Sequence, residues 1–221
     1  MRHATRFYPP ILNVSIYMSG LDTLIAKSLD TTIKENLGKK TLQKVEDRLF
    51  EKYGINLTQS IGDFTKLDTV LREFFGEGAE GLEKQFLENI VTLEETKNND
   101  PNWVAIEDPS LAKQILEAFG DEDKKNIMNT VLDEPKIISE ILEIAQIPQT
   151  SGYRKVNSLI DNGLLIVQGH MTTHDGKSVN KYKSIFENVT INIEKNKVTV
   201  KVLLAKESIE KSSIIQLVQC R

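Results

Sequence analysis

The side chains best suited to chemistry lie in one short stretch of the chain, PQTSGYRKVNSLIDNGLL, residues 148–165. Within it, Val156, Leu159 and Ile160 recur at the three- and four-residue spacing that forms one apolar stripe along a helix. Such a stripe faces a core, so the polar and basic side chains of the same helix remain outside it. These side chains are Thr150, Ser151, Tyr153, Arg154, Lys155 and Asn157.

Two of these side chains have the chemistry of nucleic-acid recognition. Arg154 can donate two parallel hydrogen bonds to a guanine, whereas Lys155 carries a compact charge that suits a phosphate. Pro148 cannot continue a preceding helix, and Thr150 or Ser151 can accept hydrogen bonds from the first free backbone N–H groups of the next one. The start of a helix also offers a positive dipole end to a phosphate. The stretch therefore predicts a helix whose first two turns contact duplex DNA.

Two further helices are expected upstream of this one. Residues 121–132 begin with acids that suit a helix N-terminus and carry apolar residues on one side. Pro135 suits the first turn of a second helix, whose wide apolar face ends near Gln146. Gly163 is expected to end the third helix, 149–162.

Two strands are expected downstream, at 164–170 and 181–186, around the polar segment MTTHDGKSVN. Asp175 and Gly176 give that segment a strong turn signal, so the pattern predicts a β-wing. From residue 149 to 183 there are five basic and two acidic residues, a local charge of +3 in a chain whose net charge is −4. This face is expected to be the one that meets nucleic acid.

The phrase QTSGYRKVNSLIDNGLL resembles archaeal transcription regulators of the winged-helix class, in the broad ArsR-like group, and the resemblance covers about half the chain. It implies that 149–157 face the DNA groove and that 171–181 form the wing. Gly152 stands where many relatives carry a larger residue, which predicts a helix start weaker by up to about 1 kcal/mol relative to Ala. The expected DNA contacts are Gln149, Thr150, Ser151, Tyr153, Arg154, Lys155 and Asn157 in the helix, with Thr173, His174, Lys177 and Lys181 in the wing.

The first half of the chain predicts a separate helical domain, residues 18–91. Helical periodicity covers 21–37 and 41–53, with Gly38 as a break between them, and returns at about 79–91. Residues 60–62 are expected to form a loop. The segment 66–75 is amphipathic, with its apolar side expected to point inward: Leu67, Val70, Leu71, Phe74 and Phe75.

This helical part resembles a small output domain of archaeal signalling and regulatory proteins, on the phrase REFFGEGAEGLEK, residues 72–84. The resemblance does not supply its biochemical role. A small molecule or a protein is its expected partner, and a ligand enclosed there would change the geometry of a dimer.

The segments around these two parts have expected roles of their own. Residues 92–107 are polar and contain Asp100-Pro101, which indicates a linker, with Trp103 pinning it to one domain. Within 187–221, Val189, Ile191 and Ile193 alternate with polar residues, as do the valines from 198 to 202, which predicts a hairpin that could extend the wing sheet or pack against a partner. The apolar tail 207–221 is either a dimer contact or a cover for the chain's own core.

Several other functions are not expected. Gly76, Gly78 and Gly81 have the spacing of a dinucleotide-binding loop, but they follow a helical stripe rather than a strand. His170 and His174 would suit a metal only on a helix, and one Cys is too few for a metal sensor. No catalytic residue set is recognisable, so neither an enzyme, a cofactor nor a metal is expected.

The sequence also has no apolar run long enough to cross a bilayer and no convincing signal peptide, so a cytoplasmic protein without a membrane partner is expected. Cys220 is expected to be inert. Met18 directly precedes the helical domain, so 1–17 are interpreted as an N-terminal extension, and either Met1 or Met18 could be the true start.

Together these patterns predict a mainly α fold with a small β component. An N-terminal helical domain (18–91) is followed by a linker, a winged helix-turn-helix domain (108–186) and a C-terminal hairpin. The expected function is transcription regulation by binding duplex DNA as a homodimer, with two reading helices roughly 34 Å apart on an inverted repeat. The alternative is a winged-helix adaptor that binds the transcription or signalling machinery without reading DNA sequence.

Overall fold

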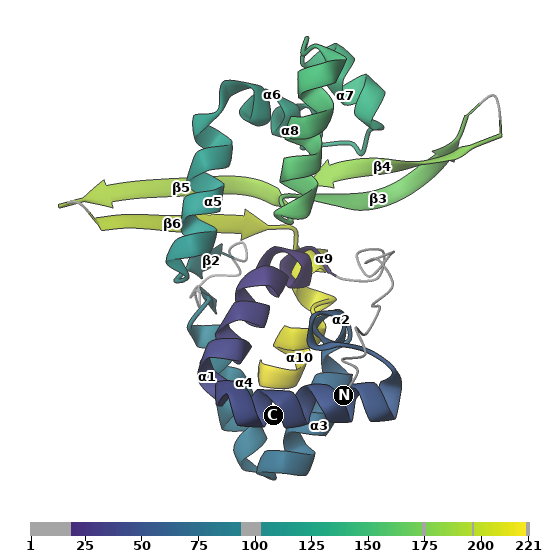
Figure 1. Cartoon of the computed structure of the whole chain (residues 1–221). Helices are drawn as coiled ribbons and strands as arrows, with labels where there is room; N and C mark the ends of the chain where they lie inside the picture. Colours follow the sequence, from purple (N-terminus) through teal and green to yellow (C-terminus); the bar gives the residue numbers. More distant parts are fainter. Residues whose placement is uncertain (1–18, 94–102, 174–175, 196, 220–221) are drawn as a thin grey trace, which may run out of the picture.

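The computed structural model describes residues 19–93, 103–173, 176–195 and 197–219. In this part of the chain the fold contains ten helices and two antiparallel sheets. Helices α1 to α4, joined by α9 and α10, form the lower part of Figure 1, a four-stranded sheet crosses the middle, and α6 to α8 lie at the top. The fold is therefore mixed, with most of its helices below and above a central sheet.

The first helices follow the expected breaks closely. α1, Gly20–Tyr53, is interrupted at Gly38, whose φ of 67° and ψ of 153° are not helical. The loop expected at 60–62 is wrong at its first two residues, because α2 spans Leu57–Ile61. Asn56 and Gln59 form a reciprocal capping box, and this pair of hydrogen bonds starts the short helix.

The next two helices differ from the expected helices at their C-terminal ends. α3 covers Phe64–Phe75 and buries Leu67, Val70 and Leu71, but Phe74 and Phe75 are 41% and 37% exposed and do not point inward. At 100° per residue Phe74 lies on the buried stripe and Phe75 beside it, so direction around the helix does not explain the exposure of Phe74. Both residues occupy the end of α3, directly before its C-cap Gly76. α4 spans Gly78–Glu88 and stops short of residue 91, because the chain turns at Asn89 and enters a strand.

The segment expected to be a linker, 92–107, contributes strands at both of its described ends. β1 is Val91–Leu93 and β2 is Trp103–Ile106, and they pair antiparallel. β2 also pairs with β6, Lys197–Leu204, which in turn pairs with β5, Phe186–Glu194. The sheet order is β1-β2-β6-β5. A strand of four residues is too short to show its periodicity, and its burial depends on a partner almost a hundred residues away.

The upper part begins with α5, Pro109–Gly120, a helix that is not among those expected. It continues with α6, Glu122–Thr130, α7, Ile138–Ile144, and α8, Gln149–Asp161. Two strands follow, β3, Leu165–Thr172, and β4, Ser178–Ser184, which pair only with each other apart from one bridge between Lys136 and Tyr182 within the described residues. The three helices and two strands expected from 121 to 186 are therefore present, with boundaries shifted by a few residues.

The upper part, 109–184, is inserted between the two halves of the central sheet, because β1 and β2 precede it and β5 and β6 follow it. The hairpins β3–β4 and β5–β6 project in opposite directions (Figure 1). The expectation that β5–β6 extends the wing sheet is therefore wrong. The hairpin instead joins β2 through β6. The buried side chains Val200 and Val202 of β6 lie opposite Ile106 and Val104 of β2.

The end of the chain returns to the first helices. α9, Lys206–Glu210, contacts α1, while α10, Ser213–Gln219, contacts α3 and α4. Ile214 and Ile215 are buried there, so the tail covers the chain's own core, which is the second of the two expected roles. Residues 187–221 are not a separate segment, and the helical domain is completed by the end of the chain.

One apolar cluster of buried side chains runs through all of these parts. Gly163 joins the upper part to α1: its φ is 70°, and a Cβ there would lie 2.6 Å from the carbonyl oxygen of Thr23. Among the described residues, no helix is long and apolar enough to cross a membrane. The expected N-terminal extension, 1–17, and Cys220 lie outside the described residues.

Candidate nucleic-acid interface

α8 starts differently from the sequence expectation. Its N-cap is Pro148, and no side chain caps the free backbone N–H groups there, so neither Thr150 nor Ser151 is the cap. The Ser151 hydroxyl instead donates to the carbonyl oxygen of Pro148 at 3.2 Å. Thr150 and Ser151 lie two and three residues after the cap position, inside the first turn of the helix, and from there the Ser151 side chain reaches backward to a carbonyl rather than forward to an N–H group.

The two sides of α8 separate by burial as the apolar stripe predicts. Val156 and Leu159 are fully buried and Gly152 is buried with them. Most of the expected contact residues are exposed, and at 100° per residue they lie within an arc of roughly 140°. The exposed members are Gln149, Thr150, Tyr153, Arg154 and Asn157.

This polar arc carries charges of both signs. Arg154 is exposed, and within the described part of the chain no ion pair engages it. Arg154 and Asn157 border a shallow hollow of about 570 Å³ with Asp161. Asp161 is exposed within the same arc and contributes a negative charge to it.

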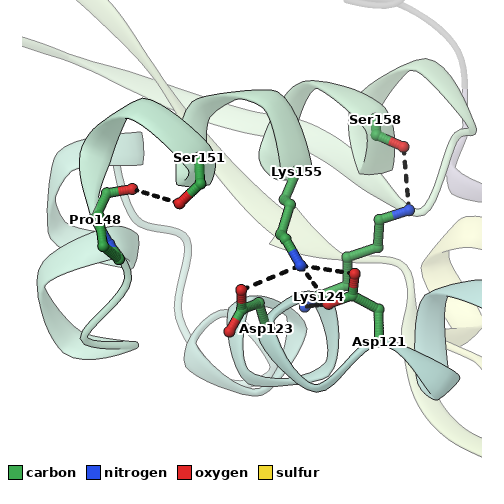
Figure 2. A network of polar contacts seen from close by, with 7 residues as sticks. All are labelled: Asp121, Asp123, Lys124, Pro148, Ser151, Lys155 and Ser158. Carbon is green, nitrogen blue, oxygen red and sulfur yellow. Dashed lines mark hydrogen bonds and ion pairs between the residues drawn. The ribbon is translucent and has the colours of Figure 1, made fainter.

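Lys155 lies at the side of α8 and is held by carboxylates of α6. Its Nζ lies 2.7 Å from Asp121 and 3.1 Å from Asp123, and the side chain is 19% exposed (Figure 2). The hydrogen bond to Asp121 raises the pKa of Lys155, and the same contact lowers the pKa of Asp121. Lys155 is therefore engaged within the protein, and a phosphate contact, its expected role, would have to compete with these ion pairs.

The same pair of helices has two more contacts. Asp121 caps α6 by accepting from the backbone N–H of Lys124 at 3.1 Å, and the Lys124 ammonium reaches the Ser158 hydroxyl of α8 at 3.3 Å (Figure 2). These bonds hold α8 against α6 over about one turn, from Lys155 to Ser158. Residues 149–183 hold five basic and two acidic residues, a charge of +3. When Asp121 and Asp123, which bind Lys155, are counted with this segment, the charge falls to +1.

The glycine in α8 is explained by the approach of α7. A Cβ on Gly152 would lie 2.4 Å from Cδ2 of Leu142, closer than real Cβ contacts come. The expectation that Gly152 weakens the helix start therefore omits its packing role. A larger residue at this position would push α7 away from α8.

The β3–β4 hairpin lies beside α8 and shares a hollow of about 390 Å³ with α7 and α8. Tyr153 lines this hollow together with Asn180 and Tyr182 of β4. Side chains alternate across a strand, so Lys181, between those two, points to the opposite face of β4. Lys181 is half-buried and lies away from the polar arc of α8.

The tip of the hairpin is closed by Thr173. Its backbone N–H and hydroxyl both donate to the carbonyl oxygen of Lys177, at 2.8 and 3.0 Å. Gly176 follows with a φ of 80°, as the turn signal requires. Lys177 is exposed beside this turn. His174, expected in the wing, lies outside the described residues.

Sequence reasoning missed two parts of this surface. Alternation along β4 could have indicated that Asn180 and Tyr182 share one face. The carboxylates that engage Lys155 precede it by more than thirty residues, and no local signal pairs them with it. In the described segments, no group of three or more His, Cys, Asp or Glu residues could hold a metal ion.

Comparison of this chain with protein-family models, with curated proteins and with solved structures gave no match.

Proposed function

We propose that residues 121–184 form a winged helix-turn-helix that binds duplex DNA in transcription regulation, with α8 as the reading helix and β3–β4 as the wing. The observation that carries the proposal is the polar arc of α8. It exposes Tyr153, Arg154 and Asn157 on a helix whose position is fixed by α6 on one side and α7 on another. A rigid helix with outward polar groups suits recognition of base edges in a major groove.

The order of the elements supports the same proposal. Three helices, α6, α7 and α8, are followed by a two-stranded hairpin, and α7 and α8 are joined by a short turn. The bridge from Lys136 to Tyr182 ties the segment before α7 to β4, so the hairpin is fixed to the helices. A wing held in this way is set at a constant distance from the reading helix.

The proposed contacts are fewer than the sequence alone indicates. Arg154 would pair with guanine, and Gln149 or Asn157 with adenine, because these are the bidentate partners that major-groove edges accept. Lys177 at the hairpin tip would contact a phosphate. Lys155 and Lys181 are not among the proposed contacts, because the first binds Asp121 and the second lies on the far face of β4.

A second candidate function is an adaptor that binds a protein through the same surface. The observation in its favour is the mixed charge around α8, where Asp161 lies in the polar arc and Asp121 and Asp123 neutralise Lys155. A surface of nearly balanced charge gains little from counterion release at DNA, whereas polar protein interfaces tolerate both signs.

The test is selection of bound duplexes from a random pool at low and moderate salt. The wild-type protein should enrich an inverted repeat, and Arg154→Ala should lose the preference at one position, a cost of about 1 to 3 kcal/mol. Lys113→Ala is the charge-matched control, because Lys113 lies on α5 and is exposed. Lys177→Ala should weaken all sequences alike and reduce the salt dependence.

Two outcomes would contradict DNA reading by α8. One is the absence of any enriched sequence at moderate salt, which would favour the adaptor. The other is equal loss of preference in Arg154→Ala and Lys113→Ala, which would mean that only net charge matters.

A further inference from the structure

The β5–β6 hairpin carries apolar side chains that no part of the described chain covers. Ile191 is 37% exposed, Ile193 67% and Val198 41%. Ile193 pairs with Val198, and Ile191 pairs with Val200, so these side chains share one face of the hairpin. The hairpin extends away from the helices on the side opposite the wing (Figure 1).

This apolar face is continuous with the core at the base of the hairpin. Val200 and Val202 are fully buried, and Val189, opposite Val202, is half-buried. Towards the turn between β5 and β6 the same apolar face continues, but its side chains there are exposed. The hairpin is thus longer than the chain's own core requires.

β5 is also an edge strand. In the sheet order β1-β2-β6-β5 it has a neighbour on one side only, so one row of its backbone N–H and C=O groups faces outward among the described residues. Edge strands are usually protected by Pro or Lys within the strand. The sequence FENVTINIE has neither. Its two charges, Glu187 and Glu194, and its register irregularity lie towards its ends, and from Glu187 to Glu194 all but one of its residues are exposed.

We propose that β5 pairs antiparallel with β5 of a second copy of this chain, across a twofold axis that passes at Ile191. The two hairpins would then join their sheets into one of eight strands, four from each copy. Closed twofold pairing of the same surface is the commonest form of homo-oligomer. It satisfies the free backbone groups and places the apolar side chains of the two hairpins side by side on one face of the joined sheet.

The apolar residues of β5 favour this register. Paired residues in an antiparallel ladder lie on the same face, so the apolar residues should oppose one another. With Ile191 opposite itself, Val189 opposes Ile193 twice. A shift of the twofold axis by one residue leaves either Ile193 opposite Glu187, at the irregular start of β5, or Val189 opposite the turn beyond Glu194, so an apolar pair is lost in both cases.

The sequence alone indicates the tail 207–221 as a dimer contact and the hairpin as a surface that could pack against an unspecified partner. That tail packs on α3 and α4 and is occupied. The strand pairing does not depend on DNA binding, and it can be tested without DNA, so its failure and the failure of the proposed function are distinguishable.

The test is the mass of the full-length protein in solution over a range of concentrations, by sedimentation equilibrium. The wild-type protein should be a dimer, and Ile191→Lys should raise the dimer Kd by about tenfold or more, because two like charges would meet on the axis. Ile144→Lys is the matched control, since Ile144 lies on α7 and is 55% exposed. Circular dichroism should show that both variants are folded.

An introduced charge pair tests the register itself. Val189→Lys and Ile193→Glu should each weaken the dimer, and the double variant, in which the two charges face each other across the axis, should dimerise more tightly than either single variant. A monomeric wild-type protein would overturn the proposal, as would an unchanged Kd in Ile191→Lys or an equal loss in Ile144→Lys. Failure of the double variant to recover would overturn the register with Ile191 on the axis.

Discussion

The carboxylate of Asp22 in α1 accepts a 2.9 Å hydrogen bond from the backbone N–H of Ser213, 191 residues later in the sequence. The Ser213 hydroxyl donates to the same oxygen at 3.1 Å, and the Ser212 hydroxyl donates to the other one. Asp22 thereby satisfies free groups at the start of α10 and ties the end of the chain to α1. Burial raises the pKa of Asp22 even though these hydrogen bonds act to lower it.

Asp22→Asn should change how stability depends on pH. The folded-state pKa is raised above the unfolded value of about 3.9, so the wild-type protein is favoured at low pH and loses stability as pH rises through the folded pKa. The Asn variant cannot ionise. The free energy of unfolding of the variant minus that of the wild-type protein should therefore rise with pH from about 4 upward.

Urea denaturation followed by the fluorescence of Trp103, the only tryptophan, measures this difference. Asp133→Asn is the control, because Asp133 is exposed. A difference between Asp22→Asn and the wild-type protein that stays constant with pH would mean that the Asp22 pKa is not raised.

Lys155→Met should reduce stability modestly rather than abolish DNA binding. The lost contacts to Asp121 and Asp123 are partly exposed, so the expected cost is at most about 1 kcal/mol. Since the pKa of Asp121 is lowered in the folded state, the stabilisation is present above about pH 4 and is lost as pH falls through the folded pKa. The two proteins should therefore become equally stable in acid.

Unfolding of Lys155→Met at pH 7 and pH 2 provides the comparison, with Lys113→Met, which loses only a surface pair with Glu117, as the reference. If Lys155→Met were as stable as the wild-type protein at pH 7, the bridge from α8 to α6 would contribute nothing to the fold.

Gly152→Ala should destabilise the protein by about 1 to 3 kcal/mol, because the new methyl group overlaps Leu142. The opposite result is expected for Gly81→Ala in α4, where no atom lies within 4 Å of the added Cβ and helix propensity favours Ala by up to about 1 kcal/mol. Thermal unfolding of the two variants would compare them. Combining Gly152→Ala with Leu142→Ala should cost less than the sum of the single changes.

Gly163→Ala combines two costs, a positive φ and contact with the backbone of α1 at Thr23. Gly176→Ala has only the first, because its φ is 80° but no atom lies near the added Cβ. A positive φ costs a non-glycine residue roughly 1 to 2 kcal/mol. Gly163→Ala should exceed Gly176→Ala in the loss of stability measured by denaturation, and equal losses would mean that α8 and α1 separate easily.

The elements that local pattern predicts are those whose signals lie within a few residues. The stripe of Val156 and Leu159 identifies α8, and the alternation of Val189, Ile191 and Ile193 identifies β5. α5 is not among the expected helices, although Asp108 caps it and Pro109 occupies its first turn, both of which are local signals.

The relationships that pattern does not predict join distant residues. Val104 of β2 pairs with Val202 of β6, and Lys155 binds Asp121. Each of these contacts depends on how whole helices and strands pack against one another. No signal within a few residues of either partner indicates it. The sequence therefore predicts the polar arc of α8, but it does not predict that Lys155 is bound by Asp121.

The insertion of 109–184 between the two halves of the central sheet has a consequence for synthesis on the ribosome. β2 emerges almost a hundred residues before its neighbour β6, and Asp22 emerges long before the serines that it binds. The inserted helices and the first four helices can each form contacts within their own group as they appear, since those contacts are local, but the first helices gain their contacts with α9 and α10 only when the last residues emerge. The inserted part can thus be folded before the first helices have all of their contacts. A product that stopped after β4 would lack α9 and α10, which pack against those first helices.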